Sequence, residues 1–314
     1  MQSDKFTALY EALASQGEAH GLCLELKTNI DLMADAATGR LLSCEEESML
    51  NTRGEARRND EPNTKGSAGW GTQPKTKAEG FGIFWDKDVR LAGILEGRGM
   101  RLFNSARCIE LCDDKSLTHI ALMGKVPQPK TVVVPLTFPR IGYTRHDFLD
   151  EIGGYLGFPL VIKECFGSFG AQVYLAHNRE QARELLVKTA GSPVLAQEYV
   201  SSSAGRDLRL YVVGGKVTAA ILRENTHGDF RANVAQGGRA TAYAPTREQE
   251  RVALRAAELL GCDFAGVDLL FGKDGQPLLL EVNSNAHFAG ISQATGVNVA
   301  DAIVAHVARS LTLE

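Results

Sequence analysis

The chain has 314 residues, of which 44% are hydrophobic and 23% are charged, and its formal net charge is −4. This length allows two or three small domains or one elaborated α/β unit, and the composition predicts a globular soluble protein. The weakly negative charge argues against a general affinity for nucleic acid. The start has no signal-like segment and no long uncharged apolar run occurs, so we expect a cytoplasmic protein without membrane contact.

The six cysteines are scattered and lack the spacing of a zinc site, which favours a reducing compartment. Cys108 and Cys112 lie four residues apart on an expected helix. Thiols in such a pair are more often packed side chains than metal ligands.

Residues 1–126 are predicted to form an N-terminal α/β domain. The run 51–77 has hardly any aliphatic residues, so about 42–80 is predicted to be a flexible insertion. Strands alternate with helices as in an open parallel sheet. The predicted helices are 5–16, 86–97, 106–111 and 117–123, and the predicted strands are 22–26, 81–85 and 100–104.

Residues 127–314 follow a proline-containing linker and hold the remaining elements. Glycine-rich turns at 214–215 and 272–277 predict two hairpins. The predicted helices are 145–156, 179–189, 247–260 and 299–311, and the predicted strands are 131–135, 159–163, 171–175, 194–200, 208–213, 216–222, 264–271 and 278–283.

The second hairpin carries three oxygen donors. Asp268 lies in the middle of the apolar strand 264–271, and Glu281 and Asn283 lie two apart, hence on one face, near the end of the strand 278–283. Antiparallel pairing of the strands brings Asp268 near the other two. Two carboxylates and an amide suit Mg²⁺ better than zinc.

A lysine beside a glycine-containing loop is a candidate phosphate site. Lys163 ends a strand, and Ser168 and Gly170 lie in the loop 164–170 that follows. Backbone N–H groups of such loops can approach phosphate oxygens. An ordinary hairpin with a surface lysine is about equally consistent with this pattern. The nucleotide fingerprints of P-loop and Rossmann proteins are both absent from the sequence.

Two further segments have weaker signals. The strand that ends at 197–200 can act as a hinge whose backbone reads adenine, with Glu198 or Asp207 holding ribose hydroxyls; a plain strand entering a Ser/Gly turn is the alternative. Arg223 and Arg231 are suited to grip a carboxylate or phosphoryl group, although loop arginines are usually solvated.

The order of these motifs resembles the ATP-grasp superfamily, in particular the RimK-like carboxylate–amine ligases typified by ribosomal-protein glutamate ligases. The resemblance extends from about Phe81 to the C-terminus and is strongest from Lys115 to His287. It implies the following site. The ATP phosphates are held by Lys115 and Lys163, together with Ser168 and Gly170 of the loop, and Arg231 and Asn233 also lie at the phosphates. The adenine hinge is formed by Glu198 and Tyr199, and Asp207 contacts the nucleotide. Arg223 lies near the acyl phosphate or substrate carboxylate, and Mg²⁺ is bound by Asp268, Glu281 and Asn283.

The resemblance implies an ATP-grasp fold, with a lid subdomain at about 127–200 and a Mg-ATP subdomain at about 201–314. The chain departs from the family at its front, where it begins on a helix without the preceding strand. A mis-assigned start codon would explain this. His287, after the metal strand, is expected to pack within its loop more than to touch substrate.

The implied function is ATP-dependent amide or peptide bond formation through an acyl phosphate, which adds glutamate or another amino acid to an acceptor. Arg231, Arg223 and Lys163 are its expected catalytic residues. The cofactors would be ATP with Mg²⁺ or Mn²⁺. The acceptor would be an amino acid, a peptide or a protein, and a homo-oligomer is a possible assembly. The alternatives are an ATP-binding homologue with a regulatory or structural role, and a ligase that makes a dipeptide or cell-wall precursor.

Overall fold

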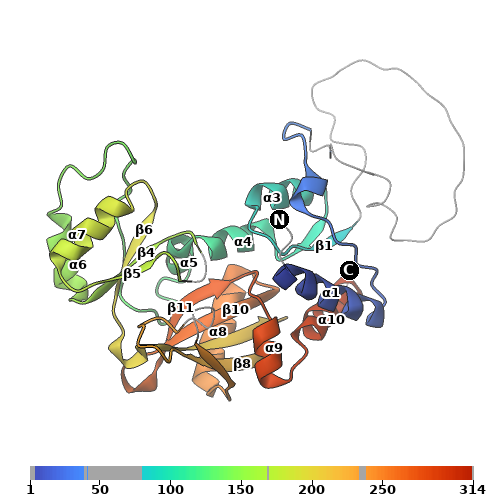
Figure 1. Ribbon diagram of the computed structural model, residues 1–314. Coiled ribbons are helices and arrows are strands. Elements are labelled where there is room, and N and C mark those ends of the chain that lie inside the picture. Colours follow the sequence, from blue (N-terminus) through green and yellow to red (C-terminus); the bar gives the residue numbers. More distant parts are fainter. Residues whose placement is uncertain (1–3, 39–40, 42–79, 168–169, 233–237, 313–314) are drawn as a thin grey trace, which may run out of the picture.

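The fold combines three β-sheets with helices in a mixed α/β arrangement, which confirms the predicted fold class (Figure 1). The computed structural model describes residues 4–38, 41, 80–167, 170–232 and 238–312. Nearly all of the predicted flexible insertion therefore lies outside the described residues. Within the described ranges, no helix is long and apolar enough to cross a bilayer.

The first part of the chain contributes one pair of parallel strands. β1 (Phe81–Ile83) pairs with β2 (Arg101–Phe103), and the crossover helix α3 (Val89–Gly97) connects the two strands. The N-cap of this helix is Asp88, whose side chain accepts a hydrogen bond from the Leu91 N–H at 3.0 Å. Among the described residues, the predicted parallel sheet consists of this pair alone. The other helices here are α1 (Asp4–Ala19), α4 (Ala106–Asp113), α5 (Lys115–Ala121) and the 3-10 turn Asn29–Leu32.

The predicted strand at 22–26 is wrong. This segment pairs with no strand among the described residues, and Leu22 and Leu24 instead pack against the core that α1 and α10 share. Apolar alternation alone does not make a strand when no sheet edge is in reach, because the backbone groups need hydrogen-bond partners.

A four-stranded antiparallel sheet follows in the order β3–β6–β4–β5. Helices α6 and α7 pack against it through a separate core that includes Leu149, Ile162 and Leu186. Figure 1 shows this unit at one end of the molecule, away from α1 and α10. Its elements are β3 (Thr131–Val133), α6 (Phe148–Leu156), β4 (Leu160–Glu164), β5 (Val173–Ala176), α7 (Arg179–Lys188) and β6 (Val194–Glu198).

The remaining sheet is antiparallel and has five strands in the order β11–β10–β7–β8–β9. β9 and α9 were not predicted from the sequence. The elements of this part are β7 (Arg206–Val213), β8 (Lys216–Glu224), β9 (Arg239–Ala242), α8 (Arg247–Leu260), β10 (Phe264–Phe271), β11 (Pro277–Asn283), α9 (Ala289–Thr295), α10 (Val299–Thr312) and the 3-10 turns Ser201–Ser203 and Lys273–Gly275.

Each face of the five-stranded sheet has its own apolar core. One core lies under α8 and also takes in residues of α4 and α5, such as Cys112 and Leu117. The other lies under α9 and α10 and takes in Leu9 and Leu13 of α1. The division of the chain at residue 126 stays a prediction, and both cores include residues from before and after it.

A β-bulge in β11 decides which side chains leave the core. Asp268 pairs with Glu281, but the next residue of β10, Leu269, pairs with Leu279, so Leu280 is the extra residue. A bulge shifts the alternation of side chains by one. Val282 and Leu279 therefore both enter the core, while Leu280 and Glu281 both face the cavity described below.

Candidate active site

A cavity of about 530 Å³ lies between the four-stranded and five-stranded sheets, with walls from β4, β5 and β6 on one side and β7, β8, β10 and β11 on the other. Every site residue that the sequence predicts and the structure describes lines it. Ser168 and Asn233 lie outside the described residues. The residues brought together are Lys115, Lys163, Gly170, Glu198, Tyr199, Asp207, Arg223, Arg231, Asp268, Glu281 and Asn283.

The three predicted metal ligands lie on one hairpin, in two residue pairs that are separated by the pair Val267–Val282. Asp268 of β10 stands opposite Glu281 of β11, and Asn283 stands opposite Gly266, two residues before Asp268. At Gly266 a side chain is excluded, because a Cβ there would come within 2.6 Å of the Ala286 Cβ. The antiparallel pairing predicted from the sequence thus gathers two carboxylates and one amide, hard oxygen donors that fit Mg²⁺.

Two arginines hold the carboxylate of Asp268. Arg209 donates from Nε and Nη2 to its two oxygens, both at 2.7 Å, and Arg223 adds a bond from Nη2 at 2.8 Å. Burial favours the neutral acid, yet the two guanidinium groups outweigh it and keep the pKa of Asp268 below its ordinary value. Asp268 is therefore charged at neutral pH, as a cation ligand must be.

Arg223 also binds Asp207 through both oxygens, at 2.6 and 2.8 Å. Burial acts against the guanidinium charge, but Asp268 and Asp207 together raise the pKa of Arg223. Asp207, predicted as a nucleotide contact, is thus engaged within the protein and is only 6% exposed. Its role toward a nucleotide stays a prediction.

Lys163 is a buried cation with one close acceptor. Its Nζ donates to Gln197 Oε1 at 2.6 Å, and Gln197 Nε2 in turn donates to Thr131 Oγ1 at 2.8 Å. Burial lowers the pKa of Lys163 to about 8, with Glu281 acting in the opposite direction. The imidazole of His119 lies beside Gln197, and burial followed by the charge of Lys163 lowers its pKa to about 4, so it is neutral.

Two more cations clasp the glycine-containing loop after β4. Lys115 Nζ donates to the carbonyl oxygens of Cys165 at 3.4 Å and Gly167 at 3.2 Å. From the other side, Arg231 Nη1 donates to the carbonyl oxygen of Gly170 at 2.6 Å, while Nη2 binds Asp229 at 2.6 Å. The loop is therefore bounded by positive charge on two sides, which is the setting a phosphate group needs.

The part of the cavity next to β6 is less polar. Glu198 ends this strand and is tied to Lys130 through its backbone and its Oε1, so the backbone of the next two residues emerges at a fixed place. Tyr199 packs edge-to-face against Phe230, with 6.2 Å between the ring centres. Apolar side chains complete the walls of this part: Val161, Val173, Val200, Leu270 and Leu280. A flat aromatic base fits such a setting.

Sequence reasoning missed three lining residues that the geometry makes important: Lys87, Gln197 and Arg209. Arg209 had a signal, because it lies two residues after Asp207 in a strand and so shares its face. Lys87 forms an ion pair with Asp113, which only the fold reveals. His287 packs on the Phe6 ring of α1, with 4.7 Å between the ring centres, and also lines the cavity, so the expected packing within its own loop stays a prediction.

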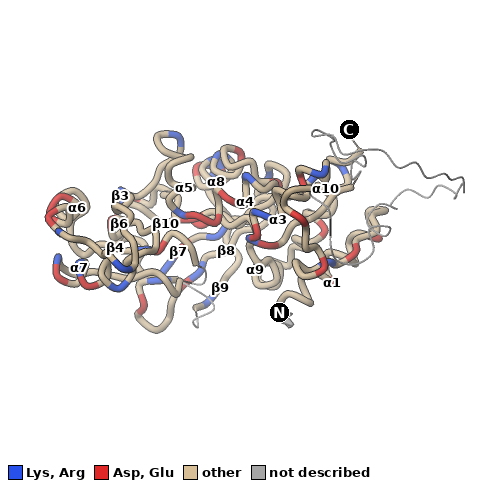
Figure 2. Tube along the Cα trace, turned by 90° about the horizontal axis from the view of Figure 1, so that it is seen from above, with Lys and Arg blue, Asp and Glu red and all other residues tan. Residues whose placement is uncertain are grey.

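The charges of the cavity suit a polyphosphate with a divalent cation. Seven lining side chains are basic and five are acidic, and the acidic ones include the two carboxylates of the β10–β11 hairpin. Figure 2 shows acidic and basic positions interspersed where β7, β8 and β10 run together. Buried and paired charges of this kind can neutralise phosphate groups without solvent.

Comparison with known proteins agrees with this geometry. Two sheets enclose a cavity that is lined by basic side chains and by an acidic hairpin, an arrangement compatible with an ATP-grasp ligase. A model of the RimK-like ATP-grasp domain matches residues 113–307, and the chain belongs to that family.

Curated relatives include a protein named "Probable alpha-L-glutamate ligase 2" from Shewanella denitrificans, 36% identical over 219 residues, or 69% of this chain and 70% of that one. Another, named "Probable alpha-L-glutamate ligase" from Syntrophotalea carbinolica, is 40% identical over 164 residues, but the match covers only 53% of its length. The matches therefore leave about 30% of the first relative and about 47% of the second uncovered.

Solved structures share the fold at low identity. A RimK domain protein from Sphaerobacter thermophilus aligns over 98% of this chain and 96% of its own, with 20% identity and a TM-score of 0.63. D-cycloserine synthetase DcsG gives 18% identity and a TM-score of 0.64, with coverage of 98% and 95%. D-alanine–D-alanine ligase from Bacillus anthracis gives 20% identity and 0.57, with coverage of 72% and 76%. At such identities the likeness shows the fold alone.

Proposed function

We propose that the protein joins a carboxylate to an amine at the expense of ATP, through an acyl phosphate. The observation that supports this reaction is that one cavity contains three cations suited to phosphate, a hairpin with oxygen donors and apolar side chains that suit a base. In the first step a substrate carboxylate attacks the γ-phosphorus, and ADP leaves. In the second step an amine attacks the acyl carbon, which releases phosphate and forms the amide.

Each group of the cavity has a role that its position supports. Lys163, Lys115 and Arg231 would bind the phosphate oxygens and offset the charge that gathers on them during transfer. Asp268, Glu281 and Asn283 would hold Mg²⁺, which supplies charge neutralisation at the β- and γ-phosphates when bound. Catalysis by position and charge needs no nucleophilic side chain from the protein.

The names of the relatives support glutamate as the amino acid that is added. Those names apply to proteins that the chain covers only in part, so the donor and the acceptor are both part of the proposal. The pairing of Arg223 with Asp207 and Asp268 supports a positioning role for this arginine, because its guanidinium holds the carboxylate of a proposed metal ligand in place.

The test incubates the protein with ATP, MgCl₂, L-glutamate and a panel of amino acids and peptides, and in separate runs the carboxylates of the glutamate or those of the panel compound are labelled with ¹⁸O. A ligase that forms an acyl phosphate releases ADP, transfers one labelled oxygen to phosphate and gives a product heavier by one acyl group. Hydroxylamine in place of the amine would trap a hydroxamate. ATP binding without ADP release under every condition would instead favour the regulatory alternative.

The matched controls are two glutamate substitutions. Glu281→Gln removes the negative charge of a proposed metal ligand, whereas Glu258→Gln changes an exposed glutamate on α8 that forms an ion pair with Arg255. We expect loss of labelled phosphate in the first and full activity in the second. Equal activity of the two variants would contradict the assignment of the hairpin.

A further inference from the structure

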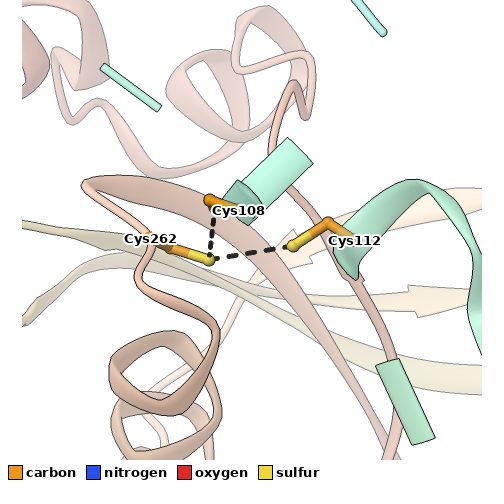
Figure 3. A group of neighbouring side chains, drawn as sticks. All are labelled: Cys108, Cys112 and Cys262. Atoms are coloured by element: carbon orange, nitrogen blue, oxygen red, sulfur yellow. Dashed lines mark hydrogen bonds between the residues drawn. The ribbon is translucent and has the colours of Figure 1, made fainter. Parts of the chain in front are cut away.

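Three thiols meet in the apolar core under α8, where α4 packs, although Cys262 lies 154 and 150 positions from the other two in sequence. Cys108 and Cys112 project from α4, and Cys262 follows α8 (Figure 3). The Sγ of Cys262 lies 3.4 Å from that of Cys108 and 3.8 Å from that of Cys112. All three sulfur atoms lie within 4.8 Å of one another.

The backbone around the cluster points each thiol inward by ordinary local geometry. Cys108 and Cys112 are one helical turn apart, so they share a face of α4. Gly261 ends α8 in the left-handed region with φ 71°, which turns the chain so that Cys262 faces that helix. Cys108 and Cys112 are buried, and Cys262 is half-buried.

The sulfur–sulfur distances are compatible with one shared metal ion. A tetrahedral centre with zinc–sulfur bonds of about 2.3 Å places its sulfur ligands about 3.8 Å from one another. The two measured separations, 3.4 and 3.8 Å, lie close to that value. A set of three thiolates is the ligand type that Zn²⁺ and other thiophilic ions prefer over the oxygen donors of the β10–β11 hairpin.

We propose that Cys108, Cys112 and Cys262 bind one thiophilic metal ion of the Zn²⁺ class. On binding, each thiol loses its proton to solvent and forms one sulfur–metal bond, and the fourth position is left to solvent or an added ligand. The ion would tie α4, which ends just before Lys115, to the segment that leads into β10 and Asp268. It would thus link two segments of the chain that lead into residues of the candidate active site.

The experiment loads the reduced full-length protein with Zn²⁺, without ATP or Mg²⁺, removes free metal by gel filtration and measures bound zinc by mass spectrometry. A parallel sample receives Co²⁺ for its absorption spectrum. We expect one ion per chain, a thiolate-to-Co²⁺ charge-transfer band and release of three protons. A free Zn²⁺ concentration of about 100 times Kd should lower the unfolding equilibrium constant about 100-fold.

Three variants locate the ion. Cys262→Ser should lose the bound metal and the charge-transfer band, whereas Cys165→Ser, which changes a buried thiol outside the cluster, should keep both. Glu281→Gln should also keep both, because its ligand set is separate from the thiols.

Several results would overturn the proposal. They are absence of the charge-transfer band in the wild-type protein, equal retention of zinc by Cys262→Ser, and loss of zinc from Glu281→Gln alone. The wild-type spectrum decides the matter even if Cys262→Ser does not fold. Activity of the ligase does not enter these readouts, so failure here leaves the proposed function untouched.

Discussion

Replacement of Lys163 by methionine separates two effects of the buried charge: its cost to the stability of the folded protein and its proposed contribution to ATP binding. The pKa of Lys163 is lowered from an ordinary 10.5 to about 8, which corresponds to about 3 kcal/mol of destabilisation at neutral pH. Methionine removes that cost and fills a similar volume. It also leaves Gln197 Oε1 without its 2.6 Å donor, a loss of about 1–3 kcal/mol. We therefore expect Lys163→Met to be between about equally stable and about 2 kcal/mol more stable at pH 7.

The pH dependence gives the sharper test. Since the unfolded chain binds the proton of Lys163 more tightly than the folded chain, wild-type stability gains from this residue as pH rises from about 8 to 10.5. The variant lacks that gain. The stability difference between variant and wild type should therefore shift by about 2 kcal/mol in favour of wild type from about pH 7 to about pH 9.5.

ATP binding should move the other way. Loss of a hydrogen bond between two charged groups costs about 1.5–3 kcal/mol, so we expect ATP affinity to fall between about 10-fold and about 150-fold. Urea unfolding at the two pH values gives the stability, and calorimetry with a non-hydrolysable ATP analogue gives the affinity. Lys216→Met, at an exposed position of β8, is the matched control and should change neither. Wild-type ATP affinity, or a stability loss above about 2 kcal/mol that does not vary with pH, would refute the reasoning.

Two other substitutions and one deletion test separate parts of the site and of the core beside it. Glu281→Gln should lower ATP turnover at least about 100-fold with little change in Tm, as measured by coupled ADP release; turnover within a factor of two of wild type would contradict the ligand role. Tyr211→Phe should cost about 1–3 kcal/mol in urea unfolding, because the Ala286 carbonyl loses its buried 2.9 Å hydrogen bond, and an unchanged midpoint would show that solvent replaces it. Deletion of Leu280 removes the bulge residue but keeps the Asp268–Glu281 pairing, so we expect a folded protein with weaker ATP binding; unfolding on deletion would show that the bulge sets the register.

The sequence predicted those parts of the fold whose signals are local. The predicted bounds of α8, 247–260, match the observed ones, and the structure shows local signals at both ends: Thr246 and Gln249 form a capping box, and Gly261 ends the helix. The pairing of β10 with β11 followed from two apolar strands around a short turn, which brought the carboxylates together. The period of two in a strand then placed Glu281 and Asn283 on the cavity side.

The remaining features depend on contacts that no local pattern contains. The bulge at Leu280 arises from how β11 lies against β10, and it puts Leu280 and Glu281 on one face against strict alternation. The period of two places Arg209 on the same face as Asp207, but only the fold shows that its partner is Asp268. The thiols of Cys108 and Cys262 are 154 positions apart, so only the fold brings them together. The segment 22–26 shows the opposite error, a strand pattern for which the fold provides no partner.

The cations of the candidate site already have protein partners before any nucleotide binds. Lys163 donates to Gln197, Lys115 to two loop carbonyls, and Arg231 to Asp229 and to the carbonyl of Gly170. These contacts hold the cations in place, which lowers the entropy cost of gathering them around a phosphate. When ATP binds, its phosphate oxygens would replace these protein acceptors as partners of the cations. The affinity for ATP is therefore a difference between two sets of hydrogen bonds and not a sum of new ones. Because Lys115 and Arg231 clasp the same loop, their substitutions should combine non-additively, whereas Lys163, held by a different strand, should combine more nearly additively with either.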